Sequence, residues 1–206
     1  MRQADLFAAA RSVPEGLVYA PELLTVAEEA ELLARIATLP LAEARYKQFT
    51  AKRRIVSYGS AYDFESNERL AAPSIPGFLM SLRDKAARWA GVPAERFAQA
   101  LVSEYRPGTA LGWHRDVPDF EIIVGVSLAA SCRMRFRPYP SSKGSFPPSA
   151  PGRQFSVVTP FEIELEPRSA YVMRDTARWG WQHSIPPTKA LRYSITFRTL
   201  RGKQKA

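Results

Sequence analysis

The two histidines of this chain lie in a pattern that predicts a mononuclear metal site. His114 is followed two residues later by Asp116, and His183 lies far downstream, nine residues before Arg192. Two histidines and one carboxylate in this pattern are typical of the facial triad that holds non-haem Fe(II) and leaves three coordination positions open. A lone His-x-Asp is more often a surface ion pair, but here both histidines belong to one constellation. We therefore predict that His114, Asp116 and His183 bind one metal ion.

Zinc is the alternative metal, because two histidines and a carboxylate also form hydrolytic zinc sites. The sequence has no helical His-Glu-x-x-His motif of the kind found in zinc hydrolases, so we prefer iron. Cys132 is the single cysteine, which excludes an internal disulfide and a cysteine-rich metal site. We expect Cys132 to be a small buried residue.

The segment after His183 carries arginines at strand spacing. Side chains of a strand alternate between its two faces, so one face should hold Arg192, Ser194, Thr196 and Arg198. Burying two arginines on one face is costly without an anionic partner. A dicarboxylate held in bidentate fashion by Arg192 would satisfy this face. The alternative is a solvated edge strand, which does not explain why the arginines follow His183 so closely.

The C-terminal half reads almost entirely as short strands. They are expected at 100–105, 113–116, 122–129, 132–137, 155–158, 161–165, 170–173 and 191–200. Strands of this number and spacing are typical of an all-β sandwich or barrel. Within one strand, His114 and Asp116 should point to the same side, and His183 must arrive from a different strand.

The N-terminal half adds helices to this core. Thr25 and Glu28 form a capping-box pattern before apolar residues at helical spacing, and Pro40 ends that helix. A second helix should run from near Gly77 to Ala90. We expect a mainly β (α+β) fold, a jelly-roll core with N-terminal helices packed on one face. The expected parts of this single domain, 1–206, are a lead-in and helix (1–44), substrate-side strands and helix (45–98), the core (99–200) and a mobile loop (138–153).

Composition limits the class of protein and its partners. The chain has 206 residues and a formal charge of +9, from 29 basic and 20 acidic side chains. Such a balance is consistent with a polyanionic partner such as nucleic acid, although a soluble protein from an arginine-rich proteome would show it equally well. The longest apolar run, 122–130, is too short to cross a bilayer, and no signal peptide is evident. We expect a cytoplasmic monomer that does not associate with membranes.

At this point the sequence resembles a known family. The triad, the terminal string Arg192-x-Ser-Ile-Thr-Phe-Arg198 and two shorter likenesses, Arg53-Arg54-Ile-Val-Ser-Tyr58-Gly59 and Tyr105-x-Pro107-Gly108, are similar to the AlkB family of Fe(II)/2-oxoglutarate-dependent dioxygenases. The resemblance covers roughly residues 45–200. It implies a double-stranded β-helix, Fe(II) on the triad, and 2-oxoglutarate and O2 as co-substrates. It also implies that Arg192 pairs with a carboxylate of 2-oxoglutarate in a pocket lined by Tyr105, Arg198, Ser103 and Ser194.

The same resemblance implies a substrate base flipped out of its helix and oxidised on an N-linked alkyl group. Tyr62 and Phe64 lie where related proteins place aromatics against the base, although period-two spacing also suits a core strand. Arg115 and Asp119 are the other expected substrate contacts. One departure concerns Pro118, which stands where nucleic-acid repair members usually have an acidic residue that helps to read the base.

We expect oxidative removal of N-alkyl groups from bases in DNA or RNA. Two alternatives stay open: the same iron chemistry on a protein or small molecule, which Pro118 favours, and nucleic-acid binding without catalysis, which the complete triad argues against. Three arginines, Arg133, Arg135 and Arg137, alternate with apolar residues. A solvated face is the default interpretation of these arginines, and phosphate contact is the alternative.

Overall fold

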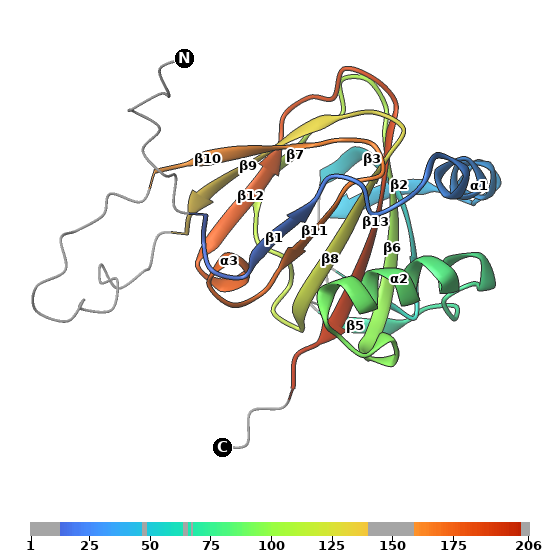
Figure 1. The fold of residues 1–206 in the computed structure, drawn as a ribbon, viewed down its shortest axis with the longest axis horizontal. Helices are drawn as coiled ribbons and strands as arrows, with labels where there is room; N and C mark the ends of the chain where they lie inside the picture. The colour runs from blue at the N-terminus through green and yellow to red at the C-terminus, as the bar shows by residue number, and fades with distance from the viewer. Residues whose placement is uncertain (1–12, 47–48, 64–65, 67, 140–158, 203–206) are drawn as a thin grey trace, which may run out of the picture.

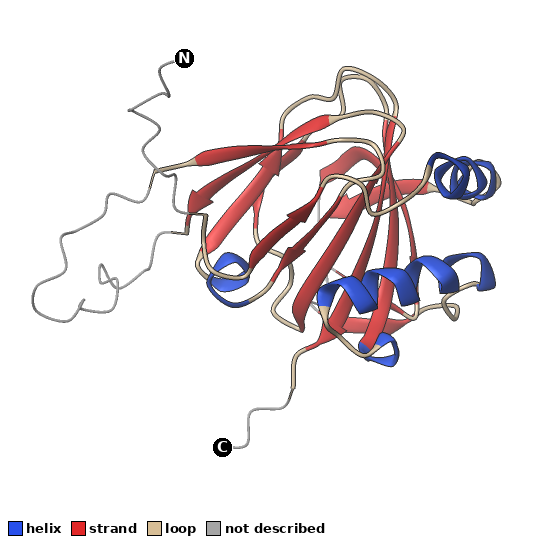
Figure 2. Cartoon of the chain, viewed as in Figure 1, coloured by secondary structure: helices blue, strands red, loops and turns tan. Residues whose placement is uncertain are grey.

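The chain folds around two antiparallel sheets that face each other (Figures 1 and 2). The computed structural model describes residues 13–46, 49–63, 66, 68–139 and 159–202. The seven-stranded sheet contains, in spatial order, β1 (Leu17–Ala20), β11 (Ala170–Met173), β8 (Phe120–Leu128), β13 (Arg192–Leu200), β6 (Phe97–Tyr105), β3 (Phe49–Tyr58) and β2 (Ala42–Tyr46). The four-stranded sheet contains β10 (Phe161–Leu165), β9 (Cys132–Pro138), β12 (Trp181–Ile185) and β7 (Leu111–His114).

Helices cover the outer face of the seven-stranded sheet, as Figure 1 shows for α2. Helices α1 (Val26–Ile36) and α2 (Met80–Ala90) pack their apolar residues against β6, β8 and β13. Thr25 and Glu28 form the expected capping box on α1, and Gly91 ends α2 with a left-handed backbone. A short helix, α3 (Asp175–Trp179), precedes β12, single 3-10 turns lie at Gly77–Leu79 and Ala94–Arg96, and β4 (Ser60–Asp63) pairs with β5 (Glu68–Ala71).

The period-two pattern of the strands creates two separate cores. On β13, Ile195 and Phe197 point toward the helices and join the first core, while the arginines and hydroxyl residues of β13 point between the sheets. A second core between the sheets includes Phe136, Trp181 and Ile185. The arginine-bearing strand is therefore central and buried, which excludes the solvated edge strand. The mainly β fold with helices on one face is confirmed.

Several local expectations were wrong. Leu17–Ala20 is not irregular, since it pairs with β11 at the edge of the sheet. The strand expected at 113–116 ends at His114, because Arg178 binds carbonyl groups of the following residues that a strand would offer to a neighbour. Helix α3 was not anticipated, and β12 was implied only through His183. The strand expected at 155–158 and nearly all of the expected loop at 138–153 lie outside the described residues. No helix in the described ranges is long and apolar enough to span a membrane.

Gly125 on β8 provides a test of this packing. A Cβ atom at Gly125 would lie 2.3 Å from Cζ of Tyr171, its partner on β11. We expect Gly125→Ala to lower the free energy of unfolding by about 1–3 kcal/mol, the usual cost of overpacking. Urea denaturation measures this loss. The control is Gly77→Ala, where an added Cβ meets nothing within 4 Å. Equal stability of the two variants would contradict the packing described for the two strands.

Candidate iron and co-substrate site

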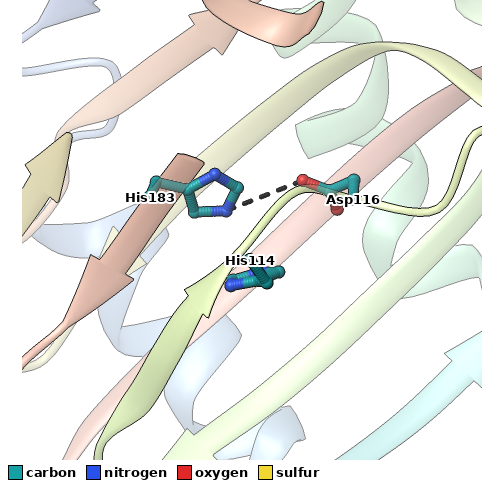
Figure 3. Close-up of side chains that lie close together, drawn as sticks. All are labelled: His114, Asp116 and His183. Carbon is teal, nitrogen blue, oxygen red and sulfur yellow. Dashed lines mark ion pairs between the residues drawn. The ribbon is translucent and has the colours of Figure 1, made fainter. Parts of the chain in front are cut away.

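The three predicted metal ligands converge between the two sheets (Figure 3). His114 ends β7, and His183 lies on the neighbouring strand β12, where antiparallel register places it directly opposite His114. Their rings are 4.2 Å apart between centroids. Asp116 reaches the same point from the loop after β7. The candidate ligand atoms of the three residues all lie within 4.8 Å of one another, which suits one shared ion.

Asp116 is oriented by an ion pair across the two sheets. Its Oδ1 atom accepts a hydrogen bond from Nε of Arg198 at 2.9 Å and forms an ion pair with Nη2 of the same residue at 2.7 Å. Its Oδ2 atom lies 3.7 Å from Nε2 of His183. Burial by itself raises the pKa of Asp116, but nearby positive charge, chiefly that of Arg198, outweighs burial and holds that pKa well below its usual range. Asp116 is therefore an ionised carboxylate with one oxygen available to a metal.

Both histidines are in the form that binds metal. Burial, and then the neighbouring His114, lowers the pKa of His183 to about 3. Burial also lowers the pKa of His114, although Asp116 opposes this shift. Nδ1 of His114 donates to the carbonyl oxygen of Gly112 at 2.9 Å, because a carbonyl can only accept. This bond leaves Nε2 of His114 for the ion, and two neutral imidazoles with one carboxylate fit Fe(II).

Arg178, which sequence reasoning missed, holds the loop that carries Asp116. Its side chain is 2% exposed. Nη2 of Arg178 donates to the carbonyl oxygens of Asp116 at 3.1 Å, Val117 at 2.8 Å and Phe120 at 2.9 Å. A guanidinium that binds three backbone carbonyls fixes the course of that loop. The sequence carries no signal for this role, because α3 was not expected and Arg178 belongs to no motif.

A small cavity of about 30 Å³ lies beside the triad and ends at Arg192. The predicted co-substrate residues Ser103, Tyr105, Ser194 and Arg198 all line it. Arg192 is 1% exposed, and its Nε atom donates to Ser127 Oγ at 3.1 Å. Its buried Nη1 atom has no hydrogen-bond partner among the described residues. A buried guanidinium with an unused donor fits the carboxylate of a bound acid.

A second and larger cavity, of about 430 Å³, also borders the triad, and His114 and Asp116 line both cavities. Tyr62 and Arg115 line it, as expected for substrate contacts, and so do Arg53 and Gln99, which were not predicted as site residues. Asp119 is not brought to this cavity, since it lies in the loop before β8 and its carbonyl accepts from the backbone N–H of Arg201. The expected contact of Phe64 lies outside the described residues. The alternation of side chains expected for a strand at 49–58 could have identified Arg53 as a residue that lines this cavity.

The metal ligands can be tested directly. We expect His183→Ala to weaken binding of Fe(II) by more than about 100-fold, which exceeds the usual effect of changing a residue that only supports a ligand. Anaerobic metal titration measures this loss, with circular dichroism to show that the variant is folded. Gln182→Ala is the matched control, because Gln182 is the neighbour on β12 whose side chain binds Arg137. Stoichiometric binding of Fe(II) by His183→Ala would refute the ligand set.

Comparison with known sequences supports the same chemistry. Residues 16–198 match the family model described as the 2OG-Fe(II) oxygenase superfamily. A protein of Arabidopsis thaliana named "Alkylated DNA repair protein ALKBH8 homolog" is 31% identical over an alignment of 187 residues, and the match covers 84% of this chain and 51% of that protein. "Uncharacterized protein L905" of Acanthamoeba polyphaga mimivirus is 33% identical over an alignment of 118 residues, and the match covers 50% of this chain and 48% of that protein. The chain spans about half the length of these curated relatives.

The fold also resembles a solved structure. The structure of OsALKBH1 aligns with a TM-score of 0.62 and 15% sequence identity, over 91% of this chain and 97% of that one. At this identity the likeness establishes the shared fold alone, the double-stranded β-helix. The family model covers most of the chain, and the triad has the geometry of a metal site. The chain therefore belongs to the 2OG-Fe(II) oxygenase superfamily and is an AlkB-like enzyme that uses Fe(II) and 2-oxoglutarate.

Proposed function

We propose that this oxygenase removes N-alkyl groups oxidatively from bases in DNA or RNA. The observation that carries the proposal is that His114 and Asp116 line both a small cavity that contains the buried Arg192 and a cavity of about 430 Å³. The arginines that line the first, Arg192 and Arg198, suit the charge of a dicarboxylate, and the second is large enough for a base and bears an aromatic side chain, Tyr62. The name of the Arabidopsis relative refers to repair of alkylated DNA.

The residues at the metal site would have separate roles in this reaction. His114, Asp116 and His183 would hold Fe(II) on one face and leave the opposite positions open. When bound, Fe(II) with 2-oxoglutarate supplies the activation of O2 that oxidises a carbon attached to nitrogen, with succinate, CO2 and formaldehyde as products. Arg198 keeps Asp116 ionised and directs its free oxygen toward the ion. A substrate that fills the large cavity would exclude bulk water from the reaction.

The proposed co-substrate residues act at the other end of the small cavity. Arg192 would pair with a carboxylate of 2-oxoglutarate through its unused Nη1 atom. Its guanidinium lies 5.1 Å from the ring centroid of Tyr105, which limits its movement. Ser103 and Ser194 face each other on β6 and β13 and would offer hydroxyl groups to the same acid. Arg198 lines the cavity at the metal end.

The proposal also includes the setting in which the chain acts. We propose one catalytic domain that works as a cytoplasmic monomer. The N-terminal strand β1 and the C-terminal strand β13 belong to one sheet, which supports a single folding unit. Cys132 is buried and forms no disulfide, which is compatible with a reducing compartment.

A protein or small-molecule substrate is the second candidate, and Pro118 favours it. Pro118 is exposed and lies outside the residues that line the large cavity, so it provides no acidic group to read a base. Among the described residues that line this cavity, Asp116 is the one carboxylate, and Arg198 already neutralises it. Recognition of a base would therefore depend on stacking and neutral hydrogen bonds rather than on an acidic side chain.

Arg192 tests the co-substrate assignment. We expect Arg192→Ala to weaken binding of 2-oxoglutarate by about 2–5 kcal/mol, because it removes a buried charged contact. Arg192→Lys should restore part of the affinity, since an ammonium keeps the charge but lacks the planar fork. Titration of 2-oxoglutarate into the metal-loaded protein measures both. An unchanged affinity in the alanine variant would remove Arg192 from the site.

The substrate class is tested by formaldehyde release from N-methylated DNA, N-methylated RNA and an N-methylated peptide of matched length. We expect release from at least one oligonucleotide and none from the peptide. Tyr62→Ala should weaken binding of the active oligonucleotide by about 1–3 kcal/mol, because it removes a stacking surface. Tyr62→Phe is the matched control, because it keeps the ring. Turnover of the peptide with silent oligonucleotides would favour the protein-modifying candidate instead.

A further inference from the structure

Arginines and aromatic rings form a continuous surface beside the large cavity. We define the arginine surface as Arg115, Arg135, Arg137 and Arg201, each of which lies over an aromatic ring. Arg135 and Arg137 lie over the same ring, that of Trp113, at 5.4 and 4.4 Å from its centroid. Arg115 lies 3.6 Å from the ring centroid of Tyr139, and Arg201 lies 4.8 Å from that of Trp179.

The strand order explains why these residues come together. β9 pairs with β12 and β12 pairs with β7, so their outward side chains form one face of the four-stranded sheet. Arg137 is the register partner of Gln182, and Arg135 is that of Ser184. Nη1 of Arg115 donates to the carbonyl oxygen of Trp179 at 2.9 Å, which links this face to the end of α3. In Figure 1 the four strands lie together, away from α2.

The arginine surface has a positive charge that the described residues do not neutralise. None of its four guanidiniums has a carboxylate within 4.0 Å in the described part of the chain. Arg133, on the same strand, differs because it pairs with Glu162 at 3.5 Å. Nε of Arg137 donates to a neutral group, Oε1 of Gln182, at 2.8 Å. Two guanidiniums on one indole repel each other, so this arrangement is improved by an anion that bridges them.

The position of this surface connects it to the active site. Trp113 and Arg115 also line the large cavity, and they flank the metal ligand His114 in the sequence. A chain bound along the arginine surface would therefore reach the opening of the cavity. Arg135 and Arg137 are separated by two residues of a strand, about 6.6 Å, a spacing at which they can contact successive groups of an extended polymer.

We propose that the arginine surface binds the phosphate backbone of a single-stranded nucleic acid while its target base occupies the large cavity. This inference rests on the proposed function. The planar fork of arginine matches phosphate in bidentate geometry, and the aromatic rings hold each guanidinium plane in a fixed orientation. Arginines stacked on rings along one path resemble the way in which proteins follow a single strand, with backbone contacts that position it without reading its sequence.

The experiment measures the salt dependence of binding to an unmodified fluorescent single-stranded oligonucleotide. Each lost phosphate contact lowers the slope of log K against log salt by about 0.7 for a single strand. We expect the slope of the double variant Arg135→Gln/Arg137→Gln to fall by about 1.4. The control is Arg35→Gln/Arg88→Gln, which removes the same charge from exposed positions on α1 and α2, across the seven-stranded sheet. This control should keep the wild-type slope.

The possible results distinguish a failure of the proposed phosphate-binding surface from a failure of the proposed function. Equal slopes for the two double variants would overturn the surface, whereas formaldehyde release from a methylated oligonucleotide by the wild-type enzyme would still support the function. Displacement of the oligonucleotide by a polyglutamate peptide of equal charge, at equal or lower concentration, would also overturn the inference, because the surface would then recognise acidic protein. A reduced slope in Arg135→Gln/Arg137→Gln alone, with circular dichroism unchanged, supports it.

Discussion

The ion pair between Asp116 and Arg198 is the interaction on which the site depends. Asp116 comes from the loop after β7 in the four-stranded sheet, and Arg198 comes from the centre of the seven-stranded sheet. The pair therefore joins the two sheets at the point where the metal ligands meet. A carboxylate buried to 6% exposure is costly to desolvate, and only a close cation or a metal offsets that cost. Loss of Arg198 would leave Asp116 as an uncompensated charge, and the position of the ligand would be lost with it.

The same reasoning explains why the pocket favours an acid. Arg192 and Arg198 extend from the same face of β13. Asp116 forms an ion pair with Arg198 and not with Arg192. Arg192 has Ser127 and the ring of Tyr105 as neighbours, and neither carries a negative charge. The interior therefore holds a surplus of positive charge at a fixed distance from the triad, set by the five strand residues that lie between the two arginines. A dicarboxylate with one end at the metal and the other at Arg192 would remove this surplus, so 2-oxoglutarate bound in the proposed way would complete the electrostatics of the folded protein.

The sequence predicted the features that depend on local geometry. Strand alternation placed the arginines of β13 on the buried face, because the two-residue period is a property of the backbone. The sequence did not predict the role of Arg178 in holding the loop, because its partners are carbonyl groups more than fifty residues away. The alternation of Arg133, Arg135 and Arg137 predicted a cationic face, yet Arg133 is paired with Glu162 because β10 lies beside β9. Choices of partner between distant strands are set by the tertiary fold, and residue spacing does not contain them.

The large cavity has few groups left with which to distinguish one base from another. Gln99 would be an obvious reader, but its Nε2 atom donates to the carbonyl oxygen of Ser60 and its Oε1 atom accepts from Arg198, both at 2.8 Å. These bonds fix its amide beside the Asp116–Arg198 pair and use one of its two N–H donors. Among the described residues that line the cavity, Ser57 carries a neutral hydroxyl group, Arg53 and Arg115 carry guanidinium groups, and most of the remaining wall is apolar. A base held there, as the proposed function requires, would be recognised mainly by its shape and its flat face, with these two arginines as its charged neighbours.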